Sequence, residues 1–177
     1  MSIALSDTPA WLTADLRSDH AGETGAVWIY RGILAVSRDA GLRGFAERHM
    51  ATEQGHLDLL EAVLPPADRS RLLPLWRAAG FLTGFLPALF GPRAVYATID
   101  AVESFVDRHY QEQLDRLDAA GIEPALRALL ARCQDDEVHH RDEAREAARP
   151  PPGALLRAWA WLVGAGAKAA VAAARRV

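Results

Sequence analysis

The chain contains two copies of a residue pattern that is typical of metal-binding helices. In each copy an isolated glutamate is followed, one helix length later, by Glu-x-x-His: Glu23, Glu53 and His56 in the first half, and Glu103, Glu137 and His140 in the second. Residues three positions apart lie on one face of an α-helix, so each Glu-x-x-His offers a carboxylate and an imidazole in the same direction. Four carboxylates and two imidazoles from four helices are the ligand set of a carboxylate-bridged centre with two iron or manganese ions.

Coincidence is the alternative to a metal site. One Glu-x-x-His is a weak signal, because so short a motif occurs by chance. The repetition, and the lone glutamate at a similar distance before each copy, favour a metal site.

Apolar residues at helical spacing predict the four helices that would carry these ligands. Thr8 reads as an N-cap before Pro9, and the helices are expected over about 9–39, 42–64, 91–121 and 124–149. The candidate ligands interrupt the apolar stripes of these helices. Buried carboxylates are costly unless they are neutralised, so their placement on core faces also favours bound cations.

Composition predicts one all-α domain. The chain has 177 residues, 50% of them apolar, and few β-branched residues. We expect a single domain over 1–177, with the bundle at about 9–148. A net charge of −3 gives no reason to expect nucleic acid. The single cysteine, Cys133, fits a reducing compartment, and the N-terminus resembles neither a secretory signal nor a transit peptide.

Two apolar segments lie outside the four helices. The first, at about 72–90, is interrupted by Pro74 and Pro87 and is too short to span a bilayer. It is either a core-packing helix or an interfacial membrane-binding segment; we favour the second, because its aromatic residues, Trp76, Phe81, Phe85 and Phe90, would otherwise lack cover. The second, a C-terminal helix at about 153–174, could bind membrane through Trp159 and Trp161, cover the bundle, or support a homo-oligomer.

The chain resembles the demethoxyubiquinone hydroxylases, the ferritin-like di-iron monooxygenases of ubiquinone biosynthesis. The resemblance rests on five segments: Asp19-His20-Ala21-Gly22-Glu23-Thr24-Gly25-Ala26, Glu53-x-x-His56, Leu72-Leu73-Pro74-Leu75-Trp76, Glu103 with His109-Tyr110, and Asp136-Glu137-x-x-His140. It covers about residues 15–145. Ser104, where relatives often carry a second acidic residue, and Gly55 depart from the pattern.

This resemblance implies a fold and a reaction. The fold would be a ferritin-like four-helix bundle with an apolar membrane-associating insert between its second and third helices and an extra C-terminal helix. The reaction would be hydroxylation of the ring of a polyprenyl benzoquinone by dioxygen at two iron ions. Reducing equivalents would come from outside the protein, since nothing in the sequence resembles a dinucleotide-binding loop, and the resemblance implies NADH as their source. The protein would lie peripherally on the cytoplasmic side of a bacterial inner membrane, with ubiquinone-biosynthesis proteins as possible partners.

The resemblance also implies residue roles. Glu53 and Glu137 would bridge the metal ions. Glu23 and Glu103 would be terminal carboxylates, and His56 and His140 terminal nitrogen ligands. Tyr110 and His109 match the pair that borders the substrate pocket in the family and are the catalytic candidates.

Other residues near the predicted site have weaker assignments. His139 competes with His140, but its register would replace Glu137 by the shorter Asp136. Asp136 and Asp107 are candidate hydrogen-bond acceptors for the ligand histidines, or solvated charges. Gly22, Gly25 and Gly32 in one helix predict close approach, either of another helix or of a flat ring.

Two other functions share part of this pattern. A ferroxidase or peroxidase of the ferritin and rubrerythrin type uses the same ligands but has no need of the apolar insert. A non-catalytic, membrane-associated quinone-binding protein would have little use for six buried ligands.

Overall fold

The computed structural model describes residues 9–121 and 124–177, which form helices and no strand. The helices are α1 (Ala10–Val36), α2 (Ala40–Val63), a 3₁₀ turn (Pro66–Asp68), α3 (Leu73–Ala88), α4 (Pro92–Ala120), α5 (Pro124–Ala147) and α6 (Ala154–Ala174). The prediction of an all-α protein is confirmed. Thr8, predicted as an N-cap, lies outside the described residues.

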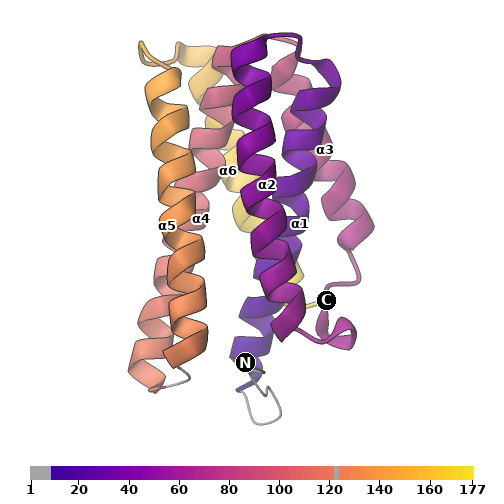
Figure 1. Cartoon of the computed structure of the whole chain (residues 1–177), viewed down its shortest axis with the longest axis vertical. Coiled ribbons are helices and arrows are strands. Elements are labelled where there is room, and N and C mark those ends of the chain that lie inside the picture. The colour runs from indigo at the N-terminus through magenta and orange to yellow at the C-terminus, as the bar shows by residue number, and fades with distance from the viewer. Residues whose placement is uncertain (1–8, 122–123) are drawn as a thin grey trace.

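The helices α1, α2, α4 and α5 form a four-helix bundle (Figure 1). Short connections join α1 to α2 and α4 to α5, which makes the members of each pair antiparallel neighbours. Asp39 caps the start of α2, where its Oδ1 accepts a hydrogen bond from the backbone N–H of Leu42 at 2.8 Å. This arrangement is the predicted ferritin-like bundle.

The bundle core consists of two apolar layers with polar residues between them. One layer contains Tyr30, Ile33, Phe45 and Ile99, and the other contains Leu16, Leu60, Leu114 and Leu130. Along each bundle helix the predicted metal ligands fall between the residues of the two layers. The apolar layers therefore hold the four helices in register around a polar middle.

Helix α3 packs along α1 rather than standing free of the bundle. Trp76, Phe81 and Phe85 are partly buried, and the Phe81 ring meets Trp28 of α1 edge-on. The expectation that the four aromatic residues of this segment lack cover is therefore wrong for three of them; only Phe90 is exposed. The other large apolar residues of this segment that face outward are leucines, namely Leu75, Leu82, Leu86 and Leu89.

Glycines allow α3 to approach α1 at backbone distance. A Cβ atom on Gly84 would lie 1.9 Å from the carbonyl oxygen of Ile29, and one on Gly32 would lie 2.2 Å from that of Phe81. No larger side chain fits at such a contact without separating the helices. Close approach of a helix, one of the two explanations predicted for the glycines of α1, holds for Gly32. Gly22 has nothing within 4 Å of a Cβ and instead lines a cavity.

Helix α6 lies across α1 and α4 and is attached at both ends. The indole N–H of Trp159 donates to Thr98 Oγ1 at 2.8 Å, and Arg175 Nε lies 2.8 Å from the buried Asp15 Oδ1. Its outer face leaves Leu155, Trp161 and Leu162 exposed. The helix thus covers the bundle and also presents an apolar surface. Among the described helices, none combines the length and hydropathy that crossing a membrane requires.

Enlarging Gly84 should destabilise the protein. Gly84→Ala places a methyl group against the Ile29 backbone, and we expect a loss of about 1–3 kcal/mol of unfolding free energy. Gly164→Ala is the matched control, because it lies in helix α6 with open space around a Cβ. The control should gain up to about 1 kcal/mol through helix propensity. Urea denaturation measures both, and equal stability of the two variants would contradict the close packing of α1 and α3.

Candidate metal centre

The structure brings the six predicted ligands together in the middle of the bundle. Their ligand atoms form two groups, within each of which all atoms lie within 4.8 Å of one another: Glu23, Glu53, His56 and Glu137 in one, and Glu53, Glu103, Glu137 and His140 in the other. Glu53 and Glu137 belong to both groups. The arrangement offers two places at which a metal ion could bind, with two carboxylates common to both.

The two histidines direct the same ring nitrogen toward the shared carboxylates. Nδ1 of His56 lies 3.1 Å from Glu137 Oε1, and Nδ1 of His140 lies 3.1 Å from Glu53 Oε1. Each histidine thus faces the glutamate of the opposite Glu-x-x-His as well as its own, at 3.6 Å for Glu53 and 3.5 Å for Glu137. The site is therefore nearly symmetric about the bundle axis.

The ligand set is buried, and much of it lacks hydrogen-bond partners. Each of the six side chains belongs to a residue that is at most 4% exposed. Among the described residues, both carboxylate oxygens of Glu53, one of Glu137, and Nδ1 of each histidine have no hydrogen-bond partner. Buried polar atoms are normally satisfied, so these five atoms fit a site that could hold a cation.

Without a metal ion, protons have to neutralise the cluster. Burial raises the pKa of Glu23 and Glu103 well above the ordinary carboxyl value, and the charges of Glu53 and Glu137 raise both further. Burial opposes protonation of His140, yet its contacts with Glu137 and Glu53 raise its pKa to about 10. The pKa of His56 is raised in the same way, against its burial. Burial pushes the pKa of Glu53 upward too, but His140 and His56 outweigh it and lower that pKa.

Of the three neighbouring residues considered from the sequence, one contacts a candidate ligand. Asp136 Oδ2 lies 3.0 Å from His56 Nε2, the ring nitrogen that faces away from the carboxylates. Asp136 is one of the two residues predicted to accept a hydrogen bond from a ligand histidine. Asp107 instead contacts Arg141 and Gln134. His139 is a surface side chain, 75% exposed, whereas His140 is buried.

Two further residues contact the cluster. His49 stacks on His140 with ring centroids 4.0 Å apart, and its Nε2 lies 2.8 Å from Glu143 Oε2. Burial, followed by the neighbouring His140, lowers the pKa of His49 to about 4. Tyr110 donates its hydroxyl hydrogen to Glu23 Oε1 at 2.6 Å. Tyr110 thus contacts one of the six candidate ligands directly, a contact between α4 and α1 that the sequence did not predict.

His109 belongs to a second buried network, which the sequence did not predict. Its Nε2 lies 3.0 Å from Asp19 Oδ1, and the amide nitrogen of Gln113 lies 2.6 Å from the same oxygen. Helical spacing alone puts Asp19 four residues before Glu23 on one face of α1. That spacing was available in the sequence, but nothing in it identified the partner on α4.

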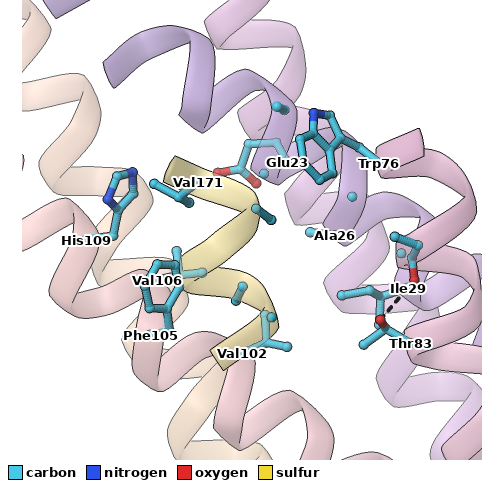
Figure 2. A pocket seen from close by; sticks show the side chains of 18 of the residues that line it. Glu23, Ala26, Ile29, Trp76, Thr83, Val102, Phe105, Val106, His109 and Val171 are labelled. Carbon is cyan, nitrogen blue, oxygen red and sulfur yellow. Dashed lines mark hydrogen bonds between the residues drawn. The ribbon is translucent and has the colours of Figure 1, made fainter. Parts of the chain in front are cut away.

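A cavity of about 610 Å³ connects the two polar clusters. It is lined by α1, α3, α4 and α6 and reaches Glu23, Glu53, Glu103 and Glu137. Figure 2 shows Glu23 and Trp76 on the α1–α3 side and Phe105, Val106 and His109 on the α4 side. Apart from the two clusters the lining is mostly aliphatic, aromatic or glycine. The cavity can therefore take an apolar molecule and bring a polar part of it to the carboxylates.

The bundle and its site define a class of protein. Four carboxylates and two imidazoles arranged as two groups with shared glutamates fit a two-metal centre of the ferritin-like kind, and the unpartnered buried atoms support that fit.

Comparison with known proteins gives the family. The sequence model of the family described as "Ubiquinone biosynthesis protein COQ7" matches residues 10–174. The chain belongs to this family.

Several named relatives match most of the chain. The chain is 38% identical over 168 residues to the 3-demethoxyubiquinol 3-hydroxylase of Rhodospirillum rubrum. The aligned residues cover 92% of this chain and 76% of the relative. The chain is 32% identical over 168 residues to the mitochondrial NADPH-dependent 3-demethoxyubiquinone 3-hydroxylase of Caenorhabditis elegans, covering 92% and 88%. The enzyme of that name from Rattus norvegicus is 34% identical over 164 residues, covering 88% and 73%.

The stability of the protein should depend on pH in opposite ways with and without metal. Protons bound to Glu23, Glu103 and His140 stabilise the folded, metal-free protein, because the pKa of each group is higher there than in the unfolded chain. This stabilisation is fully present below the pKa of the group in the unfolded chain, and it is lost as the pH rises through the pKa in the folded protein. For His140 this loss falls between pH 6.5 and about 10. With metal bound, protons compete for the ligands, so raising the pH should stabilise the protein.

Thermal denaturation midpoints, measured with a chelator and with two equivalents of ferrous iron under nitrogen, test this sign. We expect the midpoint of the chelated protein to fall from pH 6.5 to pH 9 and that of the loaded protein to rise or stay level. Parallel slopes under the two conditions would show that the six residues do not exchange protons for metal.

Proposed function

We propose that this chain hydroxylates the ring of a demethoxyubiquinone-type polyprenyl benzoquinone in ubiquinone biosynthesis, using two iron ions, dioxygen and an external reductant. Membership of the family supports the reaction, since its named relatives are 3-demethoxyubiquinol or 3-demethoxyubiquinone 3-hydroxylases. The observation that carries the proposal for this chain is the apolar cavity whose inner end is formed by the metal-site carboxylates. A ferroxidase would need the carboxylates but not the cavity.

The proposed ligand roles follow the two groups of residues. Glu53 and Glu137, which belong to both groups, would be the ligands that the two ions share. Glu23 and His56 would hold one ion with them, and Glu103 and His140 would hold the other. When bound, the iron ions supply the activation of dioxygen, of which one atom enters the ring and the other leaves as water.

The residues of the chain position the substrate and handle its protons. The apolar lining excludes water from the space next to the carboxylates, which strengthens the electrostatic interactions there. The Tyr110 hydroxyl holds a proton between the cavity and Glu23, and burial with the neighbouring Glu23 charge raises the pKa of Tyr110 well above 10. Tyr110 therefore stays protonated and acts as a hydrogen-bond donor. His109 borders the same cavity and can contact a ring oxygen.

The electron donor is proposed to be a reduced nicotinamide nucleotide. The sequence led to NADH, whereas the eukaryotic relatives carry NADPH in their names. Both nucleotides therefore belong in any assay.

Turnover can be tested with isotope-labelled oxygen. Protein loaded anaerobically with ferrous iron is exposed to ¹⁸O₂ with a demethoxyubiquinone and NADH or NADPH, and products are followed by mass spectrometry. We expect a product that gains one labelled oxygen atom. Glu53→Gln should reduce its formation by at least about 100-fold through loss of a bridging charge, while the surface variant Glu47→Gln should match the wild type. Oxygen consumption without labelled quinone would instead support a ferroxidase or oxidase.

We also propose that the exposed apolar faces of α3 and α6 bind peripherally to a membrane surface. The large apolar side chains exposed among the described residues lie on these two helices, directly after α3, or at the C-terminus. Both helices also line the cavity. A polyprenyl substrate could pass from lipid into the cavity along this surface without crossing water.

Charges placed on this surface should weaken membrane binding. Leu82 and Leu86 are 51% and 41% exposed, and we expect Leu82→Asp with Leu86→Asp to lower co-sedimentation with lipid vesicles at least about tenfold. The control carries the same added charge at exposed positions of α2 and α4, as Ala51→Asp with Ala119→Asp. Equal vesicle binding by both double variants would contradict the assignment of this surface.

A further inference from the structure

The second buried network, on the cavity wall beside His109, contains more acceptors than its donors satisfy. Asp19, Ser18 and Gln113 are each at most 4% exposed, and His109 is 7% exposed. Within the part of the chain that the structure describes, Asp19 Oδ2 and Gln113 Oε1 have no hydrogen-bond partner. The network lies one turn from the metal cluster, because Asp19 precedes the ligand Glu23 by four residues on α1, about 6 Å along the helix.

The contacts around His109 decide which ring nitrogen carries its proton. Nε2 lies 3.0 Å from Asp19 Oδ1 and 3.3 Å from Ser18 Oγ. The Ser18 hydroxyl already donates to the backbone carbonyl of Asp15 at 2.7 Å, so its oxygen is left to accept. A carboxylate oxygen also only accepts. Two acceptors therefore face Nε2, which favours a proton there.

Gln113 supplies the competing donor. Its amide nitrogen lies 2.6 Å from Asp19 Oδ1 and 2.8 Å from His109 Nε2. A hydrogen bond from this amide to Nε2 would move the ring proton to Nδ1. The charge of Asp19 decides between the two states, because a lone pair on Nε2 would point at a carboxylate oxygen 3.0 Å away.

We propose that Asp19 is a positioning residue that keeps the His109 proton on Nε2, so that Nδ1 accepts a hydrogen bond from a reduced ring in the cavity. This inference rests on the proposed function for the identity of the ring. In neutral imidazole one nitrogen donates and the other accepts. A quinol offers hydroxyl donors, whereas a quinone offers only carbonyl acceptors. The cavity therefore binds the quinol more tightly than the quinone.

The test has two measurements on full-length protein loaded with zinc, which is diamagnetic and redox-inert. ¹⁵N-resolved NMR of the imidazole rings reports which nitrogen of His109 is protonated, with His109→Gln identifying the signals. Anaerobic calorimetry measures the affinity for a demethoxyubiquinone with two isoprene units and for its quinol. For the wild type we expect a proton on Nε2 and a preference for the quinol of roughly fivefold, the size of one net hydrogen bond.

Asp19→Asn removes the charge but keeps the size of the side chain. Gln113 should then prevail, move the ring proton to Nδ1, and abolish or reverse the preference for the quinol. Gln113→Leu, which removes the competing donor, should keep the wild-type tautomer and preference. Asp107→Asn is the charge-matched control, since Asp107 lies two residues from His109 but contacts Arg141 and Gln134.

The outcomes separate this inference from the proposed function. A wild-type ring protonated on Nδ1 would overturn the inference, as would an Asp19→Asn variant with the wild-type tautomer and binding ratio. A switch in Gln113→Leu or Asp107→Asn would also overturn it. Binding of neither ring form to the wild type would overturn the proposed function, while the NMR spectrum would still decide the role of Asp19.

Discussion

Four carboxylates buried in one layer of the bundle are the constraint on which the rest of the structure depends. Placing several negative charges together in an apolar core costs far more than the two nearby imidazoles can offset. In the metal-free state the raised pKa of Glu23 and Glu103 keeps two of the four neutral. Two divalent cations would remove the need for those protons. The apolar layers above and below hold the ligands together against their repulsion.

Helices α3 and α6 enclose the cavity that leads to this buried layer. Neither helix contributes a ligand, but both line the cavity that ends at the carboxylates. Helix α3 lies close to α1 because Gly84 and Gly32 permit backbone contact. Helix α6 is attached at its ends through Trp159 and Arg175 and lines the cavity between these two points. A bundle without these two helices would keep the ligands but lose the apolar enclosure.

The cavity meets polar groups at two places, and they differ in what they offer. The metal cluster presents carboxylates and the Tyr110 hydroxyl, while the network around His109 presents imidazole. The two lie one helical turn apart on α1. Under the proposed function, a ring bound between them would have one edge at the carboxylates and one oxygen at His109. These polar groups, rather than the apolar walls, would then orient the ring.

The sequence by itself determined the bundle and the candidate ligands that meet at its centre, because both follow from spacing along single helices. Glu-x-x-His places Glu53 beside His56 whatever the helix packs against, and the helix ends predicted at about 64, 121 and 149 lie within two residues of those in the structure. Only the tertiary structure decided which side chains of α3 are covered by the bundle, and the prediction that its aromatic residues lack cover failed for that reason. The structure alone also joined Asp19 to Gln113, 94 residues away in the chain. Contacts between distant segments depend on how helices pack, and periodicity within one helix contains no information about its neighbour.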